Sequence, residues 1–231
     1  PIVSTANVSQ LASDLLISSL ELKCVGVFDP RDLVPVVGGR ENGEEGVTLP
    51  LELYANDAVD IVSRKEEFIA SVYDFIKSTK FSAVIFLSGV DLSDRTDDQM
   101  MTPSYYIRPA KSPSWDSSPL QNISNLPIPP YTSPVAPRPV PTTPSPENPV
   151  PFIPGGGLTR RILNSIPSSW PIPTVSLLQF VLEGDNRADA ALMAAVVAKI
   201  FALDGKIAEW KQPQSWQQGL FGTPQDQTLY G

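Results

Sequence analysis

Two carboxylates stand close together in the stretch EGDN, where Glu183 and Asp185 follow a long apolar run. A pair of carboxylates at the end of a strand could bind a cation or serve as general acid and general base. The same stretch has a structural use, because Asp185 or Asn186 could cap the first turn of a following helix. The sequence favours this capping role and leaves the acid–base role as the alternative.

Three consecutive glycines, Gly155, Gly156 and Gly157, precede a candidate helix in FIPGGGLTRRILNSI. Backbone N–H groups at the start of a helix bind anions, so a phosphate site is one interpretation. The spacing matches neither GxxxxGK[ST] nor GxGxxG, the two common phosphate-binding patterns. A tight turn between a loop and a helix requires glycine on steric grounds alone. We therefore favour a structural turn and keep the anion site as the alternative.

Histidine is absent from all 231 residues. Ser–His and Cys–His nucleophile pairs and histidine-containing metal sites are therefore excluded within this chain. The single cysteine, Cys24, cannot form an internal disulfide, and we interpret it as a small buried residue rather than a reactive thiol. An enzyme would have to use carboxylates, lysine or backbone dipoles. We predict no catalytic residue, no metal and no cofactor.

The apolar pattern of the first half predicts helices that alternate with buried strands. In NVSQLASDLLISSLEL the apolar residues recur at helical spacing, and Ser9 is the candidate N-cap. A strand from Lys23 to Asp29 follows, and a second helix in SRKEEFIASVYDFIKSTK leads to a buried strand from Ala83 to Leu87. The second helix is expected to bury a face formed by Phe68, Val72, Phe75 and Ile76.

The second half repeats this order, with a strand from Val175 to Leu182 and a helix from about Arg187 to Leu203. Glu183 and Asp185 therefore lie between a strand and a helix. The predicted buried face of this helix consists of Leu192, Val196, Ile200 and Leu203. Such alternation is typical of the α/β class, and we predict a layered α/β/α single domain with a mostly parallel or mixed central sheet.

The charge balance limits the classes of partner. Lys and Arg number 17 against 25 Asp and Glu, a net charge of −8, which argues against nucleic acid or an anionic membrane as the main partner. The sequence contains neither a run of about 18 apolar residues nor the pattern of a signal peptide. We expect a cytoplasmic protein that is possibly also nuclear.

Proline is concentrated in one segment, since fifteen of the 25 prolines lie between Pro109 and Pro154. Proline removes backbone donors and disfavours helix, so we expect a dispensable surface spacer without regular elements. Its PRPVP motif, Pro137–Pro141, could instead recruit a proline-reading domain. The predicted organisation is a first domain part at 1–108, a proline-rich insertion at 109–154, a second domain part at 155–222 and a flexible tail at 223–231.

Several stretches together resemble the proteasome assembly chaperone 2 family, and in particular a fungal-type member. They are PIVSTANVSQLASDLLISSL, DLVPVVGG, IPGGGLTRRIL, LLQFVLEGDNRADA and WKQPQSWQQGLFG. The resemblance implies a non-catalytic protein that pairs with proteasome assembly chaperone 1 on the outer face of the proteasome α-ring. The family also has a strand before the position of Pro1 and another near Asp57–Ser63, which this sequence does not show.

The chain ends in Leu229, Tyr230 and Gly231, a hydrophobic-tyrosine-any-residue tail. On the residues alone a frayed end would be the favoured interpretation. The resemblance instead implies that this tail docks in a pocket between adjacent α subunits, around the fifth to the seventh, and keeps activators off the immature core. Two alternatives stay open: a small-molecule α/β enzyme that uses Gly155–Gly157 with Glu183 and Asp185, and a proline-rich adaptor.

Overall fold

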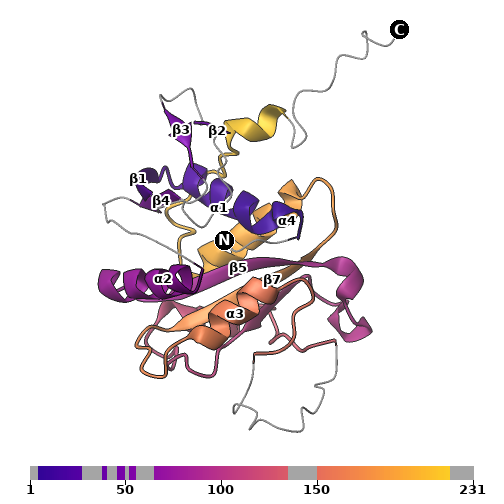
Figure 1. The fold of residues 1–231 in the computed structure, drawn as a ribbon. Helices are drawn as coiled ribbons and strands as arrows, with labels where there is room; N and C mark the ends of the chain where they lie inside the picture. The colour runs from indigo at the N-terminus through magenta and orange to yellow at the C-terminus, as the bar shows by residue number, and fades with distance from the viewer. Residues whose placement is uncertain are drawn as a thin grey trace.

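The computed structural model describes residues 5–27, 38–40, 46–49, 52–55, 65–134 and 150–218. Some sequence predictions therefore lie outside the described residues. These are the end of the first strand, most of DLVPVVGG, the PRPVP motif and the tail residues Leu229, Tyr230 and Gly231. The described elements form one layered α/β unit, as predicted (Figure 1).

The central sheet of the described part has the strand order β5-β7-β6. Strands β5 (Val84–Asp91) and β7 (Thr174–Val181) are parallel over their full lengths. Strand β6 (Ser104–Ile107) runs antiparallel to β7, so the sheet is mixed, as predicted. The sequence analysis did not identify β6, because four residues are too few to show a strand period.

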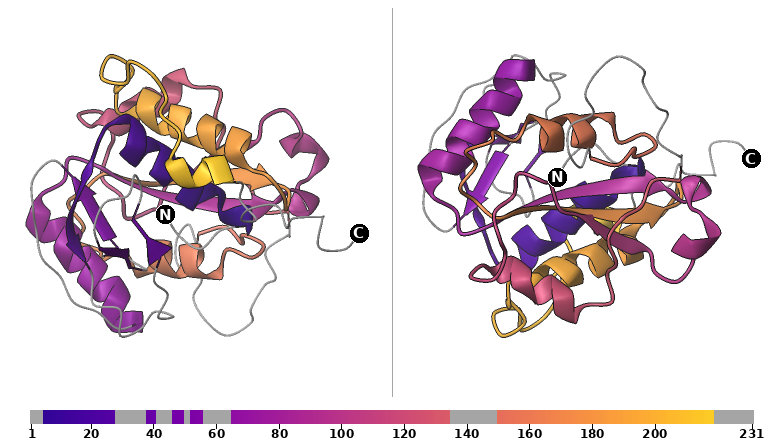
Figure 2. Two further views of the ribbon diagram at one scale, coloured as in Figure 1. Left: turned by 90° about the horizontal axis from the view of Figure 1, so that it is seen from above. Right: turned by 90° about the horizontal axis from the view of Figure 1, so that it is seen from below.

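Helices cover both faces of this sheet. Helices α1 (Val8–Ser19) and α4 (Arg187–Ile200) lie on one face, and α2 (Lys65–Thr79) and α3 (Gly157–Ser165) lie on the other (Figure 2). All eight residues of β7 are buried, and its side chains alternate between the two faces. Leu177 packs with α1 and α4, whereas Leu178 packs with α2 and α3.

Two smaller antiparallel ladders accompany the sheet. Strand β1 (Lys23–Val27) pairs with β4 (Glu52–Ala55), with a register irregularity between Cys24 and Gly26. Strand β2 (Gly38–Gly39) pairs with β3 (Val47–Thr48). The Cys24 thiol donates a hydrogen bond to the Gly26 carbonyl, and its side chain is half-buried rather than fully buried as predicted.

Two details of the helix predictions are wrong. Ser9 does not cap α1, because the helix begins one residue earlier and its N-cap is Asn7 in a left-handed conformation. The buried face of α4 also differs from the prediction, since Leu192 is 42% exposed and Leu203 lies beyond the helix end. Alanines turn inward instead, because small side chains let α1 and α4 approach closely. The buried face of α4 consists of Ala190, Met193, Ala194, Val197, Ala198 and Ile200.

The described proline-rich residues are part of the core, which corrects the expectation of a surface spacer without regular elements. Residues Pro119–Asn125 form a 3₁₀ helix, η6, whose Leu120 and Ile123 are 0% and 3% exposed and pack against Ile200. The Asn122 side chain donates a 2.9 Å hydrogen bond to the Ile200 carbonyl. Proline fits the first turn of a helix, and the apolar residues between prolines supply buried surface.

The same segment covers the edge of β6. The Tyr106 N–H donates to the Pro129 carbonyl at 3.1 Å, and the Tyr131 N–H donates to the Tyr106 carbonyl at 2.8 Å. Further along, Val150 and Ile153 are buried in the core on the side of α2 and α3. Proline on an edge leaves no N–H for a further strand, so this edge is protected against intermolecular pairing.

No helix among the described residues is long and apolar enough to cross a membrane.

Candidate functional site

The three glycines form a structural turn at the start of α3. Gly155 has φ +65, a conformation that favours glycine, and a Cβ on Gly156 would lie 2.4 Å from the Ile153 side chain. In the first turn of α3, the Thr159 hydroxyl lies 3.0 Å from the buried Ser88 hydroxyl of β5. The glycines therefore have a steric role in the turn that precedes α3.

The EGDN stretch forms the turn before α4. Gly184 has φ +139, and the Asp185 carboxylate accepts a 3.1 Å hydrogen bond from the backbone N–H of Arg187. The buried Asn186 side chain donates to the carbonyls of Leu182 and Gly184 at 2.8 and 3.0 Å. The structure places Asn186 at the N-cap of α4 without a side-chain capping hydrogen bond, and Asp185 closes the preceding turn through its bond to Arg187.

Asp185 is also paired with a cation. The Arg187 guanidinium donates to both oxygens of the carboxylate, with Nε at 2.9 and 3.0 Å. These hydrogen bonds hold the pKa of Asp185 below its ordinary value. An exposed carboxyl with a lowered pKa is a poor general acid. No group of three or more candidate metal ligands occurs among the described residues.

Arg187 connects this turn to the C-terminal segment. Its Nη1 donates a 3.1 Å hydrogen bond to the Trp216 carbonyl, 29 residues away in the sequence. Trp216 belongs to η7 (Gln214–Gln218), is 2% exposed and packs with the apolar residues of α1 and α4. Sequence analysis missed this contact, although an isolated tryptophan in the polar stretch QSWQQ is a signal of burial.

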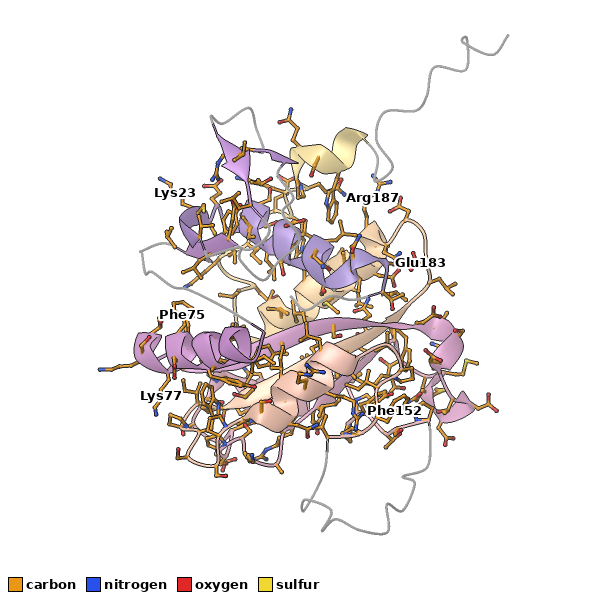
Figure 3. The ribbon with its side chains drawn as sticks, viewed as in Figure 1. Lys23, Phe75, Lys77, Phe152, Glu183 and Arg187 are labelled. Atoms are coloured by element: carbon orange, nitrogen blue, oxygen red, sulfur yellow. The ribbon has the colours of Figure 1, made fainter. Side chains whose placement is uncertain are left out.

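A second tie holds the segment upstream of Trp216. The Lys211 N–H donates a 2.9 Å hydrogen bond to the Ser19 hydroxyl at the end of α1, and the Lys211 side chain pairs with Glu21. The segment 207–218 is therefore fastened to the α1 and α4 face at two points. Figure 3 shows Glu183 and Arg187 beside the start of α4, on the side where η7 lies.

The predicted tail, residues 223–231, lies beyond this anchored segment. Leu229, Tyr230 and Gly231 lie outside the described residues, which end at Gln218. The remaining 13 residues of the sequence, 219–231, can span at most about 45 Å even when fully extended. Any pocket that receives Gly231 must lie within this distance of Gln218, the last described residue.

The model of the PAC2 family matches residues 1–198, which include the whole described sheet and most of α4. The chain belongs to the PAC2 family. This finding confirms the resemblance inferred from the sequence motifs. The matched region ends inside α4, so the Trp216 anchor lies beyond it.

Relatives of this PAC2-family chain are similar along almost its whole length. A protein of Xenopus tropicalis is 32% identical, and the similarity covers 96% of this chain and 90% of the relative. A human protein is 29% identical with the same coverage of both chains. Both relatives bear the name proteasome assembly chaperone 2.

A solved structure shares the fold. It is a protein of unknown function from Thermoplasma acidophilum, with a TM-score of 0.52 and 13% sequence identity. The similarity covers 89% of this chain and 81% of that chain. At this identity the similarity bears on the fold alone.

Proposed function

We propose that this chain is a non-catalytic chaperone of 20S proteasome assembly. The observation that carries the proposal is the similarity, over 96% of the chain, to proteins named proteasome assembly chaperone 2. The geometry is compatible, because Asp185 is engaged in the turn before α4 and in its pair with Arg187, and Gly155 and Gly156 are required by the turn before α3. These contacts weaken the enzyme alternative. The PRPVP motif of the adaptor alternative lies outside the described residues.

The proposed complex is a heterodimer with proteasome assembly chaperone 1 on the outer face of the α-ring. We place its action in the cytoplasm, with the nucleus as a second location. Purification of the native protein followed by mass spectrometry tests this directly. We expect proteasome α subunits and the sister chaperone to copurify, and a preparation without either would contradict the proposal.

In this complex the tail Leu229, Tyr230 and Gly231 docks in a pocket between adjacent α subunits, around the fifth to the seventh. Leu229 would contribute roughly 1.5–3 kcal/mol by burial, and the Gly231 carboxylate about 1.5–3 kcal/mol through a pocket lysine. Tyr230 would pack its ring and use its hydroxyl to orient the tail. Ordering each residue costs roughly 1–2 kcal/mol, so the isolated tail should bind weakly.

The body of the chaperone compensates for this weakness by raising the effective concentration of the tail. While docked, the tail would occupy a pocket that activators with similar tails require, so activators stay off the immature core.

Deletion of Leu229–Gly231 tests the tail. We expect weaker binding to isolated α-rings and an unchanged heterodimer, because the tail contacts only the ring. A second variant, extended by a few residues past Gly231, displaces the carboxylate and should weaken binding in the same direction. Unchanged affinity of both variants in a titration with α-rings would show that the tail has no docking role.

A further inference from the structure

Three large apolar side chains are exposed together at one end of the central sheet. Met100, Met101 and Leu182 are 57%, 90% and 59% exposed. The methionines precede β6 and Leu182 follows β7, and the Phe180 N–H donates to the Pro103 carbonyl at 2.8 Å. This bond extends the β6–β7 pairing towards Met101 and brings it to the end of β7. We call these three residues the methionine patch.

In the described part of the chain, Arg95 contacts the Met100 sulfur, and the apolar side chains of the methionine patch remain more than half exposed. Residues 92–103 and the start of α4 lie at the same end of the sheet (Figure 1). Leucine and methionine side chains gain free energy on burial, so their exposure at adjacent positions indicates a surface that another protein covers. Methionine is flexible and polarisable, and it adapts its shape to the surface that it meets.

Many of the residues next to the methionine patch in the sequence are carboxylates. Residues 91–101 and 182–187 together contain six carboxylates and two arginines, a net charge of −4 out of −8 for the chain. Asp97, Asp98 and Glu183 are exposed. Of the two arginines, Arg187 is paired with Asp185, and Arg95 donates to the Met100 sulfur at 3.0 Å. A matching surface would therefore present lysine or arginine around an apolar hollow.

Arg187 links the turn that follows Leu182 to the C-terminal segment. Arg187 binds the Asp185 carboxylate at the border of the patch and the Trp216 carbonyl at the anchor. One side chain thus connects the border of the patch with the element from which the last 13 residues continue. A protein that receives the tail would meet the methionine patch as part of the same contact.

We propose that Met100, Met101 and Leu182, with their acidic border, are the surface of the chaperone body that binds the proteasome α-ring. The contact on the ring would be an apolar hollow bordered by lysine or arginine. This inference rests on the proposed function and deepens it, since it identifies the body contact that a weakly binding tail needs.

The first test replaces the apolar side chains. We expect the double variant Met101→Ser, Leu182→Ser to bind isolated α-rings about tenfold more weakly or worse, because central apolar contacts dominate interface affinity. The matched control is Leu192→Ser, which removes a leucine that is 42% exposed on α4, and it should change the affinity less than twofold. Equal affinities of the double variant and the control would overturn the proposal.

The second test changes the acidic border and does not depend on the apolar variant folding. Asp97→Lys, Asp98→Lys alters two exposed residues, and we expect slower association with α-rings and a weaker dependence of the rate on salt. Circular dichroism checks that both variants keep the parent fold. An association rate and salt dependence equal to those of the parent would contradict the acidic border.

Repeating both tests without Leu229–Gly231 separates this inference from the proposed function. If tail deletion weakens binding and the two patch variants do not, the proposed role of the methionine patch is contradicted and the proposed role of the tail is supported. If the patch variants weaken binding and tail deletion does not, the proposed role of the methionine patch is supported and the proposed docking of the tail is contradicted. If the parent does not bind α-rings, the proposed function fails and the inference fails with it.

Discussion

Adjacent glycines at the start of α3 differ sharply in their surroundings. A methyl group on Gly156 would lie 2.4 Å from the Ile153 side chain, which is 1% exposed. Gly156→Ala should therefore destabilise the protein by about 1–3 kcal/mol. Gly157→Ala is the matched control, since no atom lies within 4 Å of its added methyl group, and we expect no loss of stability. Urea denaturation measures both, and equal stabilities would contradict the steric explanation.

The pair between Asp185 and Arg187 predicts a pH effect. The pKa of Asp185 is lowered by hydrogen bonds from Arg187, so the pair adds stability at neutral pH. This contribution is lost as the pH falls through the pKa of the folded state. Arg187→Gln should raise the pKa towards its ordinary value of about 4, though not fully, because the backbone N–H remains.

An NMR titration of the Asp185 carboxyl tests this expectation. Asp91 is the internal control, because its pKa is lowered by Ser93 and should not respond to the change at Arg187. An Asp185 pKa that is the same in both proteins would show that the guanidinium does not set it.

The 3₁₀ helix η6 contributes to the core although it lies in the proline-rich segment. Leu120 is fully buried, so we expect Leu120→Ala to cost about 2–5 kcal/mol of unfolding free energy. Gln121→Ala, at an exposed position of the same helix, should change stability by no more than about 0.5 kcal/mol. Thermal unfolding of both variants measures the difference. A Leu120→Ala protein as stable as the parent would show that this segment is a spacer that contributes nothing to the stability of the core.

One end of the sheet carries the methionine patch, which we assign to binding. The turn that follows Leu182 is connected to the C-terminal segment through Arg187, which binds the Asp185 carboxylate and the Trp216 carbonyl. At the edge of β6, by contrast, proline-rich residues already pair with the strand and block further strand pairing. Association of this protein is therefore expected at side-chain surfaces rather than at that edge.

The proposed heterodimer gives an expectation for the complete protein. Mixing it with proteasome assembly chaperone 1 should give a 1:1 complex that buries roughly 1,500 Å² or more, the usual size of a stable interface. Light scattering of the two proteins, alone and mixed, measures the change in mass. A monodisperse monomer that stays a monomer after mixing would contradict the heterodimer.

The sequence by itself determined the alternation of helices and buried strands. The helical spacing in residues 7–22 and 63–80 predicted α1 and α2, and the apolar run at 175–182 predicted β7 within one residue. Period and run length are properties of neighbouring residues, so they can be read without the fold. The glycine turn and the turn at Asp185 also depend on a few consecutive residues, but only the structure shows that Asn186 is the N-cap of α4.

Only the tertiary structure decided the contacts between distant residues. It showed the edge strand β6, the alanine face of α4, the burial of Leu120 and the link from Arg187 to Trp216. It also brought Met101 and Leu182 to the same end of the sheet. Each of these features depends on which chain segments pack side by side. Segments that are brought together by closing a loop of many residues leave no local pattern in the sequence, so their contacts cannot be predicted from it.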